Sequence, residues 1–372
     1  MRLTSLLPVL GLAQLATSAP SFVSQYELDA GGSRGGGQSL MDMLREDKRF
    51  SCFVEALEKE KGLRDDLERG EKTTVFAPTN DGWRRAMKEW KTQGKGSGFE
   101  MKDILQYHAA PESDISWDCL HAGALVPTSL RLKSLGDRHQ RLRVFKFADR
   151  TWLNMRAMVM DEAKAANGRI FATDHVLLPP PNAAQMMMAL PTEFSTYILG
   201  LEITGLTKDA CRETGLTILA PNNAAWKSLG LSNLKYLFSC IDQETSDRRG
   251  KDENKPECRG TRDLRRILEN SMFPGELSYS TDIAGKGCVQ MKSIAGEKTE
   301  ICAKERTGHR ASGLLGQHKD VRNFNFVVNK GESLLRFTDL LTSNGNVHVT
   351  TNVLIPEGVR LPHGDRMMEM EL

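Results

Sequence analysis

The sequence predicts an α+β fold built from two tandem domains, because three sequence blocks occur twice in the same order. The first block is the pair of segments 74–83 (TVFAPTNDGW) and 217–226 (TILAPNNAAW). Each starts with a short β-favouring apolar run, is stopped by Ala-Pro, and continues into an Asn-rich stretch that suits a helix N-cap. The expected order in each copy is strand, turn and capped helix.

The second and third blocks repeat in the same order. Segment 104–111 (ILQYHAAP) corresponds to 267–274 (ILENSMFP), and segment 168–179 (GRIFATDHVLLP) corresponds to 345–356 (GNVHVTTNVLIP). The third block predicts a closing hydrophobic strand in each copy. Three ordered blocks, each present twice, indicate tandem domains.

These blocks resemble the fasciclin domain, whose hallmarks are a TVFAPTNxAF-like opening, a central YH followed by a proline, and a closing strand that ends VLxPP. The resemblance covers residues 39–181 and 186–358. It implies that each domain is a mainly antiparallel β-sandwich or wedge, with helices between the first and middle blocks. It also implies non-catalytic adhesion, or association with extracellular matrix or cell wall.

The offset between the two copies grows along the chain. It is 143 at the first block (219 − 76), 163 at the second (274 − 111) and 177 at the third (356 − 179). Domain two therefore contains two expansions. Because a crosslink at the feet of a long loop lowers the entropy of the unfolded chain, we predict the pairs Cys240–Cys258 and Cys288–Cys302.

The N-terminus predicts export. Residues 1–19 read as a signal peptide, with Arg2, an apolar core over 6–16 and small residues near a plausible cleavage site. An extracellular or cell-wall location follows, and most of the seven cysteines should then be paired. Cys52 and Cys119 could close domain one, which leaves Cys211 as the odd candidate, although the sequence leaves this connectivity open.

Composition and the remaining segments limit the classes of partner. The net charge of +2 implies no general affinity for nucleic acid or anionic membranes. Residues 20–38 form a Gly-rich, flexible N-terminal segment. The tail 359–372 has no hydrophobic stretch, so a lipid-anchor signal is not expected.

The sequence predicts no enzyme activity and neither a cofactor nor a metal. Gly31 to Gly35 fits the G-x-S-x-G pattern formally, but a nucleophile elbow needs a strand before it and a helix after it. The eight histidines are scattered, and neither HExxH nor CxxC occurs. An unrecognised secreted hydrolase is the least favoured alternative.

Tyr107 and His108 are the first candidate binding residues. The family resemblance implies a role for this dipeptide in cell adhesion. The alternative is that both rings pack inward, with their polar atoms hydrogen-bonded to neighbouring backbone. We favour the structural interpretation, and domain two has Asn270-Ser271 at this place.

Asp339, Leu340 and Leu341 form the second candidate. They resemble the Asp-Ile-Met-type integrin-binding segment of vertebrate matrix members of the family, where an aspartate could ligate a receptor-bound divalent cation. The alternative, which we favour, is that Asp339 starts a turn and both leucines fill the core. Domain one departs from the pattern with Glu162-Ala163.

The segment from Arg131 to Arg150 is strongly basic, with seven Arg or Lys residues against Asp137 and Asp149. Its alternation predicts a hairpin with one solvated basic face. We define the basic stripe as Arg131, Lys133, Arg141 and Arg143. It could bind an acidic polysaccharide, which is the alternative to a cell-surface or matrix protein as partner. Ordinary solvated surface is the favoured interpretation of the stripe.

Overall fold

The computed structural model describes residues 37–70, 72–93, 98–147, 149–239, 258–305 and 324–362. These residues form two compact units. One holds the residues up to 131 together with 138–179, and the other holds 132–137 together with those from 180 onward. The predicted signal peptide lies outside the described residues, as do most of the Gly-rich segment and of the C-terminal tail. No described helix is long and apolar enough to cross a membrane.

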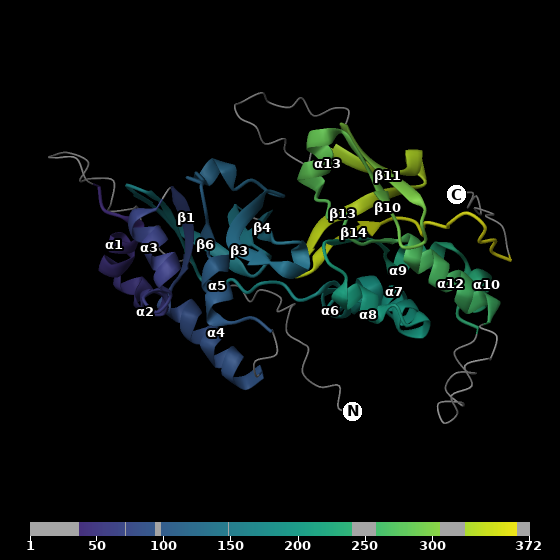
Figure 1. The fold of residues 1–372 in the computed structure, drawn as a ribbon, viewed down its shortest axis with the longest axis horizontal. Coiled ribbons are helices and arrows are strands. Elements are labelled where there is room, and N and C mark those ends of the chain that lie inside the picture. Colours follow the sequence, from purple (N-terminus) through teal and green to yellow (C-terminus); the bar gives the residue numbers. More distant parts are fainter. Residues whose placement is uncertain are drawn as a thin grey trace. The chain divides into compact units, whose positions relative to one another are not determined.

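Each unit contains a mainly antiparallel sheet (Figure 1). The strands of the first are β1 (Thr73–Pro78), β2 (Ala109–Ala110), β3 (Leu125–Leu132), β4 (Arg138–Phe147), β5 (Arg150–Leu153), β6 (Ala157–Ala165) and β7 (Gly168–Thr173). Those of the second are β8 (Leu216–Pro221), β9 (Met272–Phe273), β10 (Cys288–Lys292), β11 (Lys298–Glu305), β12 (Phe324–Val328), β13 (Ser333–Thr342) and β14 (Gly345–Thr350). The order is β2-β1-β7-β6-β5-β4-β3 in one sheet and β9-β8-β14-β13-β12-β11-β10 in the other. The two orders are equivalent, so the predicted α+β fold with tandem repeats is confirmed.

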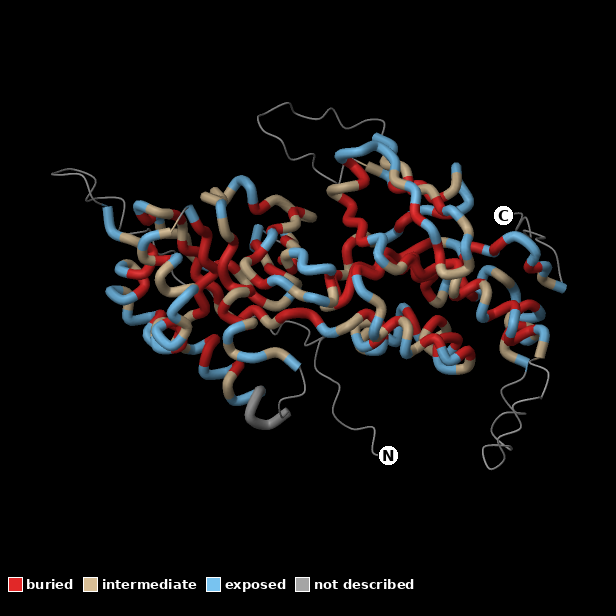
Figure 2. The backbone as a smooth tube through the Cα atoms, viewed as in Figure 1, coloured by how far each residue is buried: buried red, intermediate tan, exposed pale blue. Residues whose placement is uncertain are grey.

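The first and third blocks pair with each other at the centre of each sheet. Strand β1 runs parallel to β7, with Thr73 opposite Gly168, and β8 runs parallel to β14, with Leu216 opposite Gly345. Strands β1, β8 and β14 are buried along their whole length (Figure 2). In each sheet this parallel pair is the one departure from antiparallel pairing among the recorded registers. The sequence did not predict it.

Helices lie both before and after the first block. Domain one has α1 (Leu40–Glu46), α2 (Ser51–Leu57) and α3 (Lys61–Arg69) before β1, then α4 (Asn80–Gln93) and α5 (Met101–Tyr107). Domain two has α6 (Ala183–Met188), α7 (Pro191–Thr204) and α8 (Thr207–Arg212) before β8, then α9 (Asn223–Ser228), α10 (Leu231–Leu237), α12 (Arg259–Asn270) and α13 (Ser280–Lys286). The expectation that helices gather between the first and middle blocks was therefore incomplete.

The leading helices are needed to complete each core. In domain one, Leu44 of α1 and Phe53 of α2 are buried in one cluster with Val75 of β1. In domain two, Tyr197 of α7 is buried in one cluster with Ile218 of β8. Because one face of the central strands would otherwise meet water, burial against these helices stabilises each domain.

The disulfide predictions are met in part. Cys288 and Cys302 are bonded, as predicted, but they lie directly opposite each other on β10 and β11 and so join a hairpin. The extra residues of the second expansion lie instead between β11 and β12, over 306–323, where domain one has only 148–149. Cys258 is disulfide-bonded. Cys240 lies outside the described residues, so the Cys240–Cys258 pair stays a prediction for non-reducing peptide mapping.

The suggested Cys52–Cys119 pair is wrong. Both are free thiols, and so is Cys211. Cys52 on α2 packs against the helical core of domain one, whereas Cys119 is exposed at the end of the 3-10 helix Trp117–Cys119, with its Sγ 3.3 Å from Ser116 Oγ. Counting cysteines does not bring two of them together in space, since a disulfide also requires close and correctly directed Cβ atoms.

Candidate functional site

Tyr107 ends α5 and is fully buried. Its hydroxyl donates a hydrogen bond to the backbone oxygen of Arg141 at 2.9 Å and accepts one from Asn154 Nδ2 at 2.7 Å. The phenol therefore fixes α5 to strand β4 and to the turn that follows β5. Both partners of the hydroxyl belong to domain one, and nothing of the side chain is presented to solvent.

His108 is also fully buried, against the ring of Phe53. Its Nδ1 lies 2.7 Å from the oxygen of Ile104, and its Nε2 lies 3.0 Å from the backbone N–H of Leu177. Nδ1 therefore donates and Nε2 accepts, which is the pattern of a neutral imidazole. Burial lowers the pKa of His108 to about 4 and keeps the ring uncharged. These contacts agree with the structural interpretation of the dipeptide.

Domain two replaces the histidine with a different buried pair. Ser271 follows α12, and its hydroxyl donates to Leu268 O at 2.7 Å. The hydroxyls of Tyr197 and Ser271 are 2.7 Å apart, and both side chains are buried. The equivalent position therefore links a leading helix to the end of α12, and it does so without an imidazole.

Asp339 is only 1% exposed and lies within β13, at an irregularity in its pairing with β14. Its backbone has a φ of 58°, in the left-handed region that Asp and Asn tolerate better than most residues. The expected turn at Asp339 is therefore a bulge inside a strand. Leu341 is buried and Leu340 packs against the core of domain two, as the favoured interpretation predicted.

The carboxylate of Asp339 is occupied by neighbouring donors. It accepts from the backbone N–H of Ser280 at 2.9 Å, from the Ser280 hydroxyl, and from Asn346 Nδ2 at 2.9 Å. Asn346 Nδ2 also donates to Ser278 O, and His348 Nε2 lies 3.2 Å from the same oxygen. The aspartate joins β13, β14 and the start of α13, and it is not presented for ligation of a receptor-bound cation.

Domain one has an ion-paired version of this junction. Arg169 of β7 takes the place of Asn346, and its Nε donates to Asp114 Oδ1 at 2.5 Å. Its Nη1 donates to the carboxylate of Glu162, which takes the place of Asp339. The sequence comparison set Glu162-Ala163 against Leu340-Leu341, but the strand registers set Ala163 against Leu340 and therefore Glu162 against Asp339. The change from Asp339 to Glu162 is accompanied by the change from Asn346 to Arg169. In both domains this segment holds strands together.

The basic stripe lies on the predicted hairpin, β3 and β4, whose turn contains Gly136 and Asp137 at positive φ. Arg131 is exposed and its Nε donates to His139 Nε2 at 3.1 Å. Arg141 and Arg143 are half-buried, and the guanidinium of Arg143 lies 5.0 Å from the ring centre of Phe145. Lys133 lies in the turn rather than on a strand, so the four side chains do not share one strand face.

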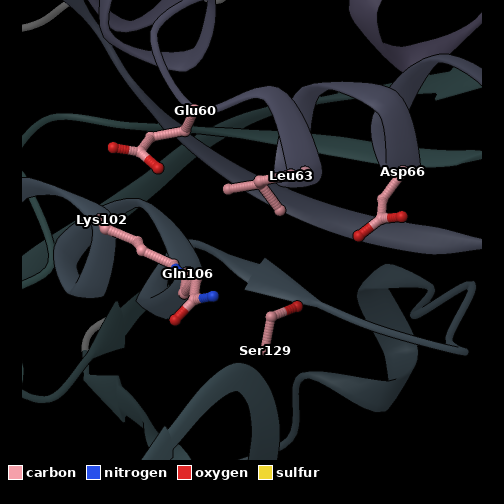
Figure 3. A pocket seen from close by; sticks show the side chains of 7 residues that line it. Glu60, Leu63, Asp66, Lys102, Gln106 and Ser129 are labelled. Carbon is pink, nitrogen blue, oxygen red and sulfur yellow. The ribbon is translucent and has the colours of Figure 1, made fainter.

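A hollow with a volume of about 280 Å³ lies between α3, α5 and β3 (Figure 3). Its lining is mostly polar, and consists of Glu60, Gly62, Leu63, Asp66, Lys102, Gln106 and Ser129. These seven lining residues include neither a cysteine nor a histidine. Among the described residues, the cluster with metal-ligand spacing is Cys288, Glu300 and Cys302, and its two sulfurs are bonded to each other.

The family model for the Fasciclin domain matches residues 48–179 and 192–356, which together are most of the chain. The chain belongs to the fasciclin-domain family. Proteins with this domain are typically adhesion or extracellular matrix proteins.

Three curated proteins are similar to parts of the chain. Transforming growth factor-beta-induced protein ig-h3 is 33% identical over 148 residues in Oryctolagus cuniculus and 34% identical over 148 residues in Sus scrofa. Each match covers 40% of this chain and 20% of the relative. Aurofusarin biosynthesis cluster protein S of Gibberella zeae is 28% identical over 213 residues, 54% of this chain and 50% of the relative. The matches thus span between a fifth and a half of these relatives.

Among solved structures, a FAS1 domain pair from the insect cell adhesion molecule Fasciclin I is similar to 84% of this chain and 98% of its own, with 18% identity and a TM-score of 0.38.

The asparagines of the fasciclin blocks have a role that the sequence did not reveal. Asn80 accepts from the N–H of Cys52 at 2.9 Å, and the equivalent Asn223 accepts from the N–H of Thr196 at 3.0 Å. Both therefore hold a leading helix. Only Asn222, one position earlier, acts as the predicted N-cap, of α9.

The Asn-Gly pair before each closing strand has a similar task. Asn167 accepts from the N–H of Leu40 at 2.7 Å, and Asn344 accepts from the N–H of Ala183 at 2.9 Å. Each asparagine fixes the first helix of its fasciclin domain to the last strand. The recurrence of these two asparagines at a fixed offset was the signal available in the sequence. Their partners, Leu40 and Ala183, lie more than a hundred residues away and therefore leave no local pattern.

We predict that His108→Ala lowers the free energy of unfolding of domain one by about 1–3 kcal/mol, because it removes two buried hydrogen bonds. The folded pKa of about 4 is below the ordinary value of 6.5, so the histidine's contribution is complete above pH 6.5 and is lost as the pH falls through 4. Denaturant melts at several pH values will show a smaller difference between parent and variant at low pH. His121→Ala is the control, and a pH-independent difference would contradict the assignment.

Proposed function

We propose that this chain is a secreted, non-catalytic adhesion protein that associates with extracellular matrix or cell wall. The observation that carries the proposal is that the candidate polar residues hold each domain together. Tyr107, His108 and Asp339 all form hydrogen bonds within their own domain. The same is true of Asn80 and Asn344. They build a scaffold, which leaves partner recognition to the outer surfaces of the two domains.

A bead assay tests this function. Beads coated with residues 20–372 should be retained on the surface of the producing cells, and protease treatment of those cells should abolish retention if the partner is a protein. Beads coated with a globular protein of similar net charge are the control. Retention no greater than that of the control beads would overturn the adhesive function.

A second candidate is binding of an acidic polysaccharide by domain one. It is favoured by the exposed Arg131 and the half-buried Arg141 and Arg143 on the β3–β4 hairpin. Salt separates the two candidates, because the Debye length falls from about 10 Å at 0.1 M to about 3 Å at 1 M ionic strength. Retention on an anionic polysaccharide should weaken over this range, whereas protein-directed adhesion through apolar contacts should not.

A further inference from the structure

A row of large apolar side chains crosses three strands on the outer face of the domain-one sheet. Phe145 of β4 lies opposite Trp152 of β5, and Trp152 lies opposite Met158 of β6. Side chains directly opposite on neighbouring strands project from the same side of a sheet. All three are half-buried. They are the centre of what we call the aromatic–arginine face.

The neighbouring row of residues on the same strands shows that the aromatic–arginine face is the side of the sheet away from the core. Val144, Leu153 and Ala157 are paired in register and are fully buried. Because successive residues of a strand point to opposite faces, the row with Phe145 and Trp152 points away from that core.

Arginines flank the row on both sides. The Arg143 guanidinium lies 5.0 Å from the Phe145 ring centre, and Arg150 Nη1 lies 3.8 Å from Met158 Sδ. Phe147 lies opposite Arg150 at the end of the hairpin and is 78% exposed. The aromatic–arginine face thus consists of Arg143, Phe145, Phe147, Arg150, Trp152 and Met158.

The charge on this face is net positive, with Arg143 and Arg150 on the strands and Asp149 in the turn between β4 and β5. Strands β4 and β5 contain neither Asp nor Glu. The acids of β6 are bonded elsewhere, since Asp161 pairs with Arg49 and Glu162 with Arg169. A partner that covers the face must bring negative charge close to the arginines and apolar surface close to the rings.

We propose that the aromatic–arginine face binds a polyanionic polysaccharide, an inference that rests on the second candidate function. The C–H face of a sugar ring lies flat against an aromatic ring, while arginine pairs with carboxylate or sulfate through two parallel hydrogen bonds. The row from β4 to β6 covers two strand spacings, about 10 Å, which suits a short stretch of a linear chain. An acidic polypeptide such as polyglutamate would supply the charge but no flat C–H surface to lie against Phe145 and Trp152.

Domain two lacks this arrangement and provides an internal control. Its equivalent outer row is Cys302, Val327 and Leu334, which contains no aromatic ring. Cys302 is tied to Cys288, and the same face carries Glu300. The site is therefore assigned to domain one alone.

The test uses residues 20–372 with polygalacturonate and heparin as probes, neutral dextran as a control for sugar rings, and polyglutamate as a control for charge. The parent should bind both acidic polysaccharides more tightly than either control polymer. The double variant Phe147→Ala/Arg150→Ala should bind them about tenfold more weakly, the effect of losing one good contact. Its unfolding should be unchanged, because both side chains are exposed.

Trp152→Ala should weaken binding by a similar factor, and Trp152→Phe should restore most of it. Leu334→Ala, which truncates the residue equivalent to Met158 on the outer row of domain two, should have no effect on binding. Unchanged binding by the Phe147/Arg150 variant, or equal binding of polyglutamate and polygalacturonate, would overturn the site. In the bead assay, a variant that loses polysaccharide binding but still adheres to cells supports the site and leaves protein-directed adhesion standing.

Discussion

Gly168→Ala and Gly345→Ala are each expected to lower the free energy of unfolding of their own domain by about 3 kcal/mol or more. A Cβ atom at Gly168 would lie 1.8 Å from the backbone oxygen of Thr73, and one at Gly345 would lie 1.8 Å from that of Leu216. Each oxygen belongs to the strand that pairs with the glycine, so it cannot move without breaking the central parallel pair. Gly168 also has a φ of 152°, which side chains rarely adopt.

Denaturant unfolding of the two single variants measures this effect, and each should weaken one domain and spare the other. Gly62→Ala is the control, because Gly62 lies on the exposed side of α3 with nothing within 4 Å of the added methyl. That change should stabilise α3 by up to about 1 kcal/mol, since Ala is the better helix former. A Gly168→Ala protein that unfolds like its parent would show that the strands are further apart than described.

These glycines show what the sequence predicted and what it did not. The offsets of 143 and 177 reappear in the strand registers, because Leu216 and Thr73 differ by 143 and Gly345 and Gly168 by 177 (216 − 73 and 345 − 168). The repeat therefore predicted equivalent strands correctly. It did not predict that the first and last blocks pair in parallel, because contacts between distant segments leave no local pattern.

The candidate site divides in the same way. Burial of Tyr107, His108 and Leu341 followed from apolar surroundings visible in the sequence. The aromatic–arginine face did not, because Phe145 and Trp152 become neighbours only through the register of β4 and β5. The basic stripe was defined from the charges along the chain. It therefore included Lys133, which lies in the turn between β3 and β4.

Asp339→Ala is expected to lower the free energy of unfolding of domain two by about 3 kcal/mol, because it removes the acceptor of three hydrogen bonds. The N–H and hydroxyl of Ser280 and the amide of Asn346 would each lose a partner in a buried place. Alanine also fits the φ of 58° less well than aspartate does. Asp339→Asn should fall between parent and Ala, since it keeps the shape and one acceptor oxygen but adds an NH₂ that faces other donors.

The same two variants decide between a structural and a receptor-binding aspartate. If Asp339 is structural, cell adhesion in the bead assay falls only as far as the folded fraction falls, and Asp339→Asn keeps most of it at a temperature where it is folded. A cation-ligating aspartate would instead lose adhesion in both variants at unchanged stability, because ligation needs the carboxylate charge. Asp161→Ala, one position before the equivalent residue Glu162, is the control in domain one. Its partly exposed ion pair with Arg49 should contribute no more than about 1 kcal/mol to the free energy of unfolding, so stability and adhesion should both stay close to the parent values.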